Sequence, residues 1–277
     1  MNKEILRKLQ LTQLEIAKEI KRVCEQNSIR YWIDSGTLLG AVRHKGFIPW
    51  DDDMDMGMMR SDYEKFIRIA PECLSEKYEL VYWENNEFYP HQFAKVVKRG
   101  TIYQEEAHLK HWNNGIFVDI FPYDVYPNIE KLRKKQGFYL TMLRGIIRVK
   151  CGHSTWYADG KFHLKRWITN LPYRFFSIFH TKQYFIKKYN YYATMYDTEK
   201  QIKNFFPQGI SKYGKWIIPA DVFEEYSKEK FEDTEFSIPK GYDIYLNCAY
   251  GDYMQLPPET ERENRHSLKK LDFGDEY

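Results

Sequence analysis

Residues 30–59 read Arg30-Tyr31-Trp32-Ile33-Asp34-Ser35-Gly36-Thr37-Leu38-Leu39-Gly40, then Arg43-His44-Lys45-Gly46-Phe47-Ile48-Pro49-Trp50, then Asp51-Asp52-Asp53-Met54-Asp55-Met56-Gly57-Met58-Met59. Four carboxylates fall within five positions, and an alternating methionine run follows. Carboxylates this close repel one another unless a cation lies among them. Strand side chains alternate between faces, so we expect Asp51, Asp53 and Asp55 on one face and the methionines in the core. Mg²⁺ prefers carboxylate and phosphate oxygens, so the pattern predicts a divalent-cation site.

The segment before the acidic run predicts a short strand at residues 31–33 and a short helix that begins at Ser35-Gly36-Thr37. Gly36 allows a ligand to approach the backbone, and a helix N-terminus presents free N–H groups to an anion. The alternative is a plain helix cap followed by core leucines. The aspartates a few residues later favour the phosphate-binding interpretation.

Asp119 is the second candidate ligand, because it is a lone acid inside the apolar run Ile116-Phe117-Val118-Asp119-Ile120-Phe121. A buried carboxylate costs several kcal/mol unless a cation or a donor meets it. The alternative is a hydrogen-bonded core aspartate. We expect Asp119 to join the metal site, and we expect Pro122 to end its strand.

Other segments show the usual signals of helices and strands. Apolar spacing predicts a helix over residues 3–27, and the capping box from Ser61 to Glu64 predicts the start of another. Further strands are expected at residues 79–83, 92–98, 101–104, 215–219 and 235–239, and a short helix at 243–250 stopped by Gly251. The tail from Lys269 is expected to be loosely ordered.

Composition restricts the class of protein. The chain has 277 residues, 17% aromatic residues and a net charge of only +3. Its four cysteines are far apart and form no CxxC pair, which fits a reducing cytosol. The N-terminus lacks the apolar region of a secretory signal, and no apolar run approaches the roughly 20 residues of a spanning helix. We therefore expect a cytoplasmic protein, in solution or peripheral on the inner face of the membrane.

Residues 131–190 differ sharply from the rest, with 14 Lys and Arg against one acid, Asp159, and many interleaved aromatics. The pattern predicts two or three helices, with loops around 152–160 and at Pro172. A solvated helical face, an anionic membrane surface and a nucleic-acid site are the three interpretations. Basic residues mixed with Trp and Phe suit a membrane interface, so we place an anionic membrane surface first. No nucleic-acid motif is present, and nucleic acid is not an expected partner.

The quoted motif from Asp34 to Asp55 resembles the signature of the LicD family, which includes bacterial phosphocholine transferases and is related to the fukutin group. The run Val118-Asp119-Ile120-Phe121-Pro122 is similar to the later acidic strand of the family. The segment from Tyr250 to Pro258 resembles its C-terminal segment. The resemblance covers residues 30–125 and 250–266 and implies an α/β (α+β) fold, with a nucleotidyltransferase-like mixed sheet flanked by helices. The composition adds a basic, largely helical insertion, which resembles no part of the family signature. We therefore expect one catalytic domain over 1–277, with a core at 30–125, the basic helical segment at 131–200 and a C-terminal segment at 235–266 that returns to the core.

The resemblance also implies an activity. A transferase of this kind would move phosphocholine, or a similar substituted phosphate, from CDP-choline or another CDP-linked donor to a sugar hydroxyl. The acceptor would be a glycan or lipid-linked glycan precursor of teichoic acid, lipopolysaccharide or capsule. We expect Mg²⁺ or Mn²⁺ at Asp51, Asp53, Asp55 and Asp119, with Asp53 or Asp119 as the base. The expected substrate-binding residues are Gly36, Thr37, Arg43, His44, Lys95, Arg262 and His266.

Three other functions remain open at the level of sequence. A glycosyltransferase also uses an Asp-x-Asp motif to hold a nucleotide-sugar through a metal, although that motif is short. A nucleotidyltransferase would keep the nucleotide and release pyrophosphate. A lipid- or glycan-binding scaffold would need no metal. An EF-hand is excluded, because its glycine would fall at Met56 and its bidentate glutamate at Asp62.

Overall fold

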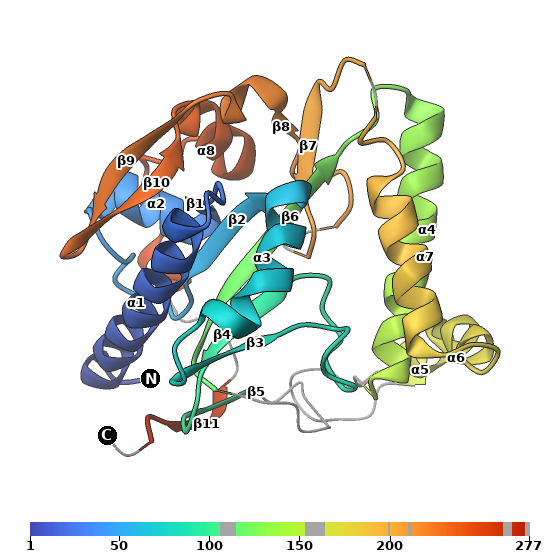
Figure 1. The fold of residues 1–277 in the computed structure, drawn as a ribbon, viewed down its shortest axis with the longest axis horizontal. Coiled ribbons are helices and arrows are strands. Elements are labelled where there is room, and N and C mark those ends of the chain that lie inside the picture. Colours follow the sequence, from blue (N-terminus) through green and yellow to red (C-terminus); the bar gives the residue numbers. More distant parts are fainter. Residues whose placement is uncertain (106–114, 153–163, 199, 210–211, 263–267, 275–277) are drawn as a thin grey trace.

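The computed structural model describes residues 1–105, 115–152, 164–198, 200–209, 212–262 and 268–274. Within them, a mixed seven-stranded sheet has the order β1-β2-β6-β4-β3, and β7 pairs with both β6 and β8. Its strands are β1 (Trp32–Ile33), β2 (Asp55–Met59), β3 (Tyr78–Val81), β4 (Ala94–Lys98), β6 (Phe117–Val125), β7 (Asn204–Pro207) and β8 (Ile218–Pro219). The expected mixed sheet flanked by helices is confirmed (Figure 1).

Helices α1 (Lys3–Gln26) and α3 (Arg60–Cys73) pack on the central strands of this sheet. α2 (Ser35–His44) packs on β2 and contacts α8 (Tyr242–Tyr250). Two antiparallel strand pairs accompany the sheet: the hairpin of β9 (Tyr226–Phe231) and β10 (Thr234–Pro239), and β5 (Ile102–Glu105) paired with the distant β11 (Leu268–Asp272). Two short 3-10 helices lie at Ala220–Phe223 and Glu259–Glu261.

The basic segment forms the helical side of the molecule. It consists of α4 (Glu130–Lys150), α5 (Leu164–Thr169), α6 (Leu171–Ser177) and α7 (Lys182–Thr194). α4 and α7 lie side by side, and α5 and α6 project at one end of this pair (Figure 1). The described part of the segment therefore has four helices, and the expectation of two or three is wrong. Pro172 lies in the first turn of α6, where a missing N–H costs nothing, rather than in a loop. The expected loop around 152–160 lies almost wholly outside the described residues.

Pro122 does not end β6, because the strand continues to Val125. β4 pairs with β6 as far as Ile120, and β7 takes over the same edge from Tyr123. Pro122 falls at the junction between these two partners, so its missing N–H interrupts neither ladder. Its carbonyl still accepts a hydrogen bond from the Gln208 N–H at 2.9 Å.

Two other expectations are corrected. α3 begins at Arg60 with Met59 as its N-cap, so Ser61 lies inside the first turn and no side chain caps the helix, while Asp62 accepts hydrogen bonds from Arg30. The first part of the tail from Lys269 belongs to β11 (Leu268–Asp272), which pairs with β5. Across the described part of the chain, no helix combines the length and the apolar character that crossing a bilayer requires.

Candidate active site

The site begins where two parallel strands place their acids side by side. β2 and β6 are neighbours, and Asp55 lies directly opposite Asp119. On the other side of β6, Lys95 of β4 is opposite Asp119, with its Nζ 2.5 Å from Asp119 Oδ1. Cross-strand partners share a face, so the three charged side chains stand together. Each is at most 8% exposed.

Asp55 is the least satisfied of these groups. Among the residues that the structure describes, no group donates a hydrogen bond to Asp55 Oδ1, which is buried. Burial raises the pKa of Asp55 well above its usual value, and the charges of Asp53 and Asp119 raise it further. A buried carboxylate with a free oxygen among other acids is the environment that a cation relieves.

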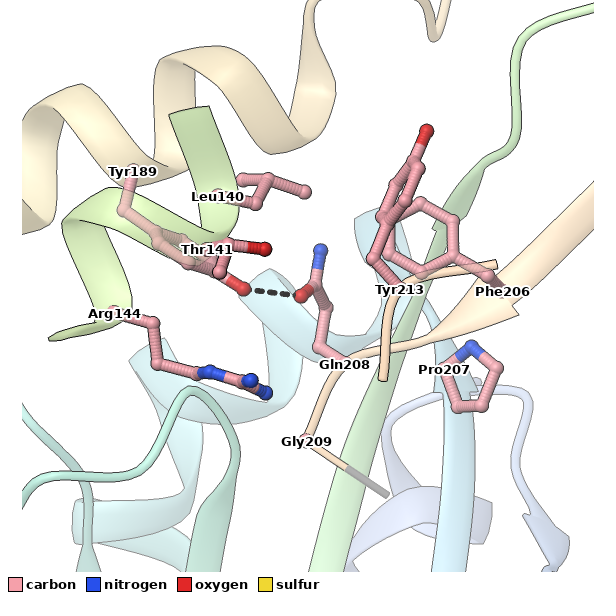
Figure 2. A pocket seen from close by; sticks show the side chains of 9 residues that line it. All are labelled: Leu140, Thr141, Arg144, Tyr189, Phe206, Pro207, Gln208, Gly209 and Tyr213. Carbon is pink, nitrogen blue, oxygen red and sulfur yellow. Dashed lines mark hydrogen bonds between the residues drawn. The ribbon is translucent and has the colours of Figure 1, made fainter. Parts of the chain in front are cut away.

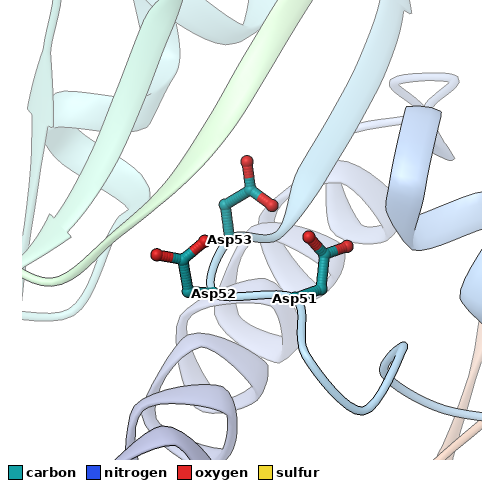
Figure 3. A group of neighbouring side chains, drawn as sticks. All are labelled: Asp51, Asp52 and Asp53. Atoms are coloured by element: carbon teal, nitrogen blue, oxygen red, sulfur yellow. The ribbon is translucent and has the colours of Figure 1, made fainter. Parts of the chain in front are cut away.

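Three more carboxylates lie on the loop that leads into β2 (Figure 3). Asp51, Asp52 and Asp53 each place one oxygen within 4.8 Å of the others. The strand begins only at Asp55, so the predicted alternation of Asp51 and Asp53 along a strand is wrong. The irregular backbone brings these carboxylates together instead, and it adds Asp52, which also accepts a hydrogen bond from the Tyr103 hydroxyl at 3.2 Å.

Two glutamines of α1 hold this loop. Gln10 Nε2 donates to the Asp51 carbonyl at 2.9 Å, and Gln13 Nε2 donates to the Asp52 carbonyl at 3.0 Å. Both glutamines are buried. Sequence reasoning missed them, although polar residues within the apolar stripe of a helix are a recognisable signal.

The start of α2 lies against the acidic loop. A Cβ on Gly36 would come within 2.8 Å of Asp51 Oδ2, so glycine is needed for the carboxylate to reach this position. The Thr37 hydroxyl accepts a hydrogen bond from the Asp55 N–H at 2.8 Å, which leaves its own proton available. Ser35 has a left-handed φ of +50°. Its buried hydroxyl has no hydrogen-bond partner among the described residues.

Asp34 is a functional candidate that sequence reasoning did not single out. It is fully buried, and its carboxylate accepts hydrogen bonds from the hydroxyls of Tyr123 at 2.9 Å and Tyr245 at 2.5 Å and from the Trp32 indole at 3.2 Å. These contacts explain why Asp34 does not cap α2 with its side chain. Burial raises the pKa of Asp34, and the hydrogen bonds oppose that shift. Because Tyr245 belongs to α8, Asp34 ties the C-terminal segment to the core.

A group of cationic and aromatic side chains borders the acidic loop. Arg262 lies 5.6 Å from the centre of the Trp50 ring, and His44 contacts the same ring edge-on. Burial and then the nearby Arg262 lower the pKa of Arg43. Arg43 also donates a hydrogen bond to the Tyr253 carbonyl at 2.6 Å. It therefore fixes the loop after α8 in addition to contributing positive charge beside the acidic loop. The predicted residues Arg43, His44 and Arg262 are thus brought together, and His266 lies outside the described residues.

Lys95 is not free to act as a separate phosphate ligand, because it is paired with Asp119.

A separate small pocket lies between α4, α7 and the end of β7 (Figure 2). The Tyr189 hydroxyl donates to Gln208, and Gln208 in turn donates to Asp124. The cavity of about 20 Å³ has room for one water. None of the predicted site residues lines this cavity. The hydrogen bonds through Gln208 join Tyr189 of α7 to Asp124 of β6.

Residues 28–142 match the family model described as "LicD/FKTN/FKRP, nucleotidyltransferase domain". The chain is 30% identical over 276 residues to the lipopolysaccharide cholinephosphotransferase LicD of Haemophilus influenzae, covering 96% of this chain and 97% of that protein. It is 46% identical over 48 residues to the human ribitol 5-phosphate transferase FKRP, covering 17% of this chain and 10% of that protein. An uncharacterized protein of Rickettsia prowazekii, RP689, is 43% identical over 117 residues, or 42% of this chain and 41% of that protein.

The two relatives with a stated activity are both transferases of phosphate-containing groups. The chain belongs to the LicD family, as the sequence motif predicts.

Proposed function

We propose that the protein transfers phosphocholine, or a similar substituted phosphate, from a CDP-linked donor to a sugar hydroxyl of a cell-surface glycan precursor. One observation carries the proposal: Asp55 and Asp119 stand opposite each other beside the Asp51–Asp53 loop, with a buried Asp55 oxygen that no described group satisfies. The full-length relationship to a lipopolysaccharide cholinephosphotransferase supports the choice of transferred group.

The candidate metal ligands fit a hard divalent cation, since they are carboxylate oxygens on a pair of neighbouring strands and an adjacent loop. Asp51, Asp53, Asp55 and Asp119 would hold Mg²⁺ or Mn²⁺. The bound cation would neutralise the diphosphate of the donor and the leaving cytidine monophosphate.

The remaining residues position the substrates. The N-terminus of α2 presents the Gly36 backbone and the Thr37 hydroxyl, and Arg43, His44 and Arg262 offer positive charge at the border of the site. The acceptor hydroxyl must lose a proton as its oxygen attacks the donor phosphorus and the bond to cytidine monophosphate breaks. Asp119 would break its ion pair with Lys95 on taking that proton, so we assign the base to Asp53.

The acceptor is a glycan or a lipid-linked glycan in this proposal. In this proposal the reaction takes place in the cytoplasm. The basic segment 131–190 would bring the enzyme to an anionic membrane, where a lipid-linked acceptor is found.

The test is transfer from CDP-choline to isolated lipopolysaccharide or a glycan precursor, with products identified by mass spectrometry. We expect a phosphocholine-modified glycan and cytidine monophosphate, formed only with a divalent cation. Asp53→Asn and Asp55→Asn should abolish product, whereas Asp233→Asn, which removes a 69% exposed carboxylate that pairs with Lys18, should not. Full activity in EDTA would reject the metal-dependent mechanism. Released pyrophosphate would indicate a nucleotidyltransferase, and sugar transfer from a nucleotide-sugar would indicate a glycosyltransferase.

A further inference from the structure

Helices α5 and α6 carry an exposed apolar surface that the proposed reaction does not use. We call it the α5–α6 surface, defined by the side chains of Leu164, Ile168, Phe175, Phe176, Ile178 and Phe179, which are 47–73% exposed. Proteins in solution rarely expose contiguous apolar patches beyond a few hundred Å² unless the patch binds something. In Figure 1, α5 and α6 stand at the edge of the molecule, away from the hairpin of β9 and β10.

The packing of α6 on the rest of the protein explains why these side chains face outward. Tyr173 lies on Gly145 of α4, where a Cβ would come within 2.8 Å of the Tyr173 ring. In this contact the Tyr173 ring lies so close to the α4 backbone that only glycine fits at position 145. The neighbouring Phe175 and Phe176 contact each other edge-on, and Phe175 also contacts Phe179, without being buried.

An open groove continues the surface between α4, α6 and α7. It encloses about 410 Å³, and Phe176 and Phe179 of the α5–α6 surface form one of its walls. Met142 and Ile146 of α4 contribute apolar side chains, and Lys188 contributes an ammonium. The groove therefore combines an apolar lining with a cation, as an acyl chain and its anionic head group require.

The positive charge around this surface favours an anionic lipid bilayer over a second copy of the protein as its binding partner. Residues 131–190 contain 14 Lys and Arg and one acid. On the surface itself, Lys165 is exposed, and the exposed Arg174 lies 5.9 Å from the centre of the Trp167 ring. Two copies of such a surface would repel each other, whereas anionic lipid attracts it and accepts its aromatic side chains.

We infer that the α5–α6 surface docks on an anionic lipid bilayer, with Phe175, Ile178 and Phe179 entering the interface and Lys165 and Arg174 meeting the head groups. This inference rests on the membrane role that the proposed function gives to the basic segment 131–190, and it names the surface that makes the contact. Because docking needs neither the donor nor the metal, its failure can be distinguished from failure of the transferase activity.

The experiment is co-sedimentation of the full-length protein with vesicles of phosphatidylcholine alone or mixed with phosphatidylglycerol, without donor, acceptor or divalent cation. We expect binding to the mixed vesicles only. Phe175→Ser/Phe179→Ser should weaken binding at least tenfold, as expected for losing two exposed aromatic side chains that would enter the interface. Lys165→Gln/Arg174→Gln should weaken it by about fivefold per charge at low salt and less at high salt.

The matched control is Ile5→Ser/Leu11→Ser, which changes two apolar residues of α1 that are 40% and 44% exposed. It should bind vesicles as the wild type does, and all variants should keep the wild-type circular dichroism. Unchanged binding by Phe175→Ser/Phe179→Ser would overturn the inference, as would equal binding to neutral vesicles. Self-association that this variant abolishes, without vesicle binding, would instead identify a contact between two copies.

Discussion

Replacing Lys95 tests the electrostatics of the site directly. Lys95 is 4% exposed, its Nζ is 2.5 Å from Asp119 Oδ1, and it lies 3.2 Å above the centre of the Phe117 ring. Lys95→Met keeps the apolar stem but leaves the Asp119 carboxylate buried beside Asp55 without its cation. Breaking one partner of a buried ion pair costs about 3–5 kcal/mol. For a chain of this size, the loss lowers the melting temperature by roughly 10 °C.

Calorimetric unfolding in EDTA measures this cost. The double variant Lys95→Met/Asp119→Asn should lose about 2 kcal/mol less than the sum of the two single variants, because removing both partners leaves no unpaired charge. Added Mn²⁺ should raise the melting temperature of Lys95→Met more than that of the wild type.

Lys134→Met is the matched control for this prediction. Lys134 pairs with Glu130 at 2.7 Å, but both side chains are at least 75% exposed. This variant should lose no more than about 0.5 kcal/mol. If Lys95→Met were no more destabilising than Lys134→Met, the charged cluster between β2, β4 and β6 would not be electrostatically coupled, and the reasoning would be refuted.

Three further predictions concern the loop, the pH dependence and the scaffold. Gly36→Ala places a Cβ within 2.8 Å of Asp51 Oδ2, so we expect about tenfold weaker Mn²⁺ binding by calorimetry with unchanged circular dichroism; unchanged binding would contradict this. Burial and then the neighbouring carboxylates raise the pKa of Asp55, so the folded, metal-free protein binds this proton more tightly than the unfolded chain does. The stability of the metal-free protein should therefore fall as the pH rises through the pKa of Asp55. Over the same range Mn²⁺ should bind more tightly, because the carboxylate has lost its proton. Thermal unfolding from about pH 5 to 8, with and without Mn²⁺, measures both effects. Asp124→Asn removes the buried partner of Arg60 at 2.6 Å and should cost about 3–5 kcal/mol without changing Mn²⁺ affinity, since this pair lies outside the proposed ligand set; a weakened affinity would count against that separation.

The local sequence predicts that Asp55 and Asp119 lie on strands, and the structure confirms this placement, although β2 begins at Asp55 and not at Asp53. A lone acid in an apolar run makes Asp119 a candidate ligand, and the alternating methionines after Asp53 indicate the second strand. Their meeting depends on the parallel register of β2 and β6, which pairs Asp55 with Asp119 across more than sixty residues of chain. Strand alternation fixes which side chains share a face within one strand, but it does not specify the partner strand.

The contacts that the sequence did not reveal join distant parts of the chain. The pairing of Lys95 with Asp119 requires β4 to lie beside β6, and the hydrogen bond from Tyr245 to Asp34 spans 211 positions. Asp51 and Asp53 gather through an irregular loop held by α1, which no strand period describes. Pro122 reads locally as a strand terminator, and only the change of partner from β4 to β7 explains its place inside β6.

Calorimetric titration of Mn²⁺ into the wild type and Asp55→Asn most directly tests whether these carboxylates hold a divalent cation. Asp55 offers the buried oxygen that lacks a hydrogen-bond partner among the described residues. We predict binding with proton release in the wild type, at least tenfold weaker binding in Asp55→Asn, and wild-type binding in the Asp233→Asn control. Equal affinity in Asp55→Asn and the wild type, or no binding in either, would contradict the account.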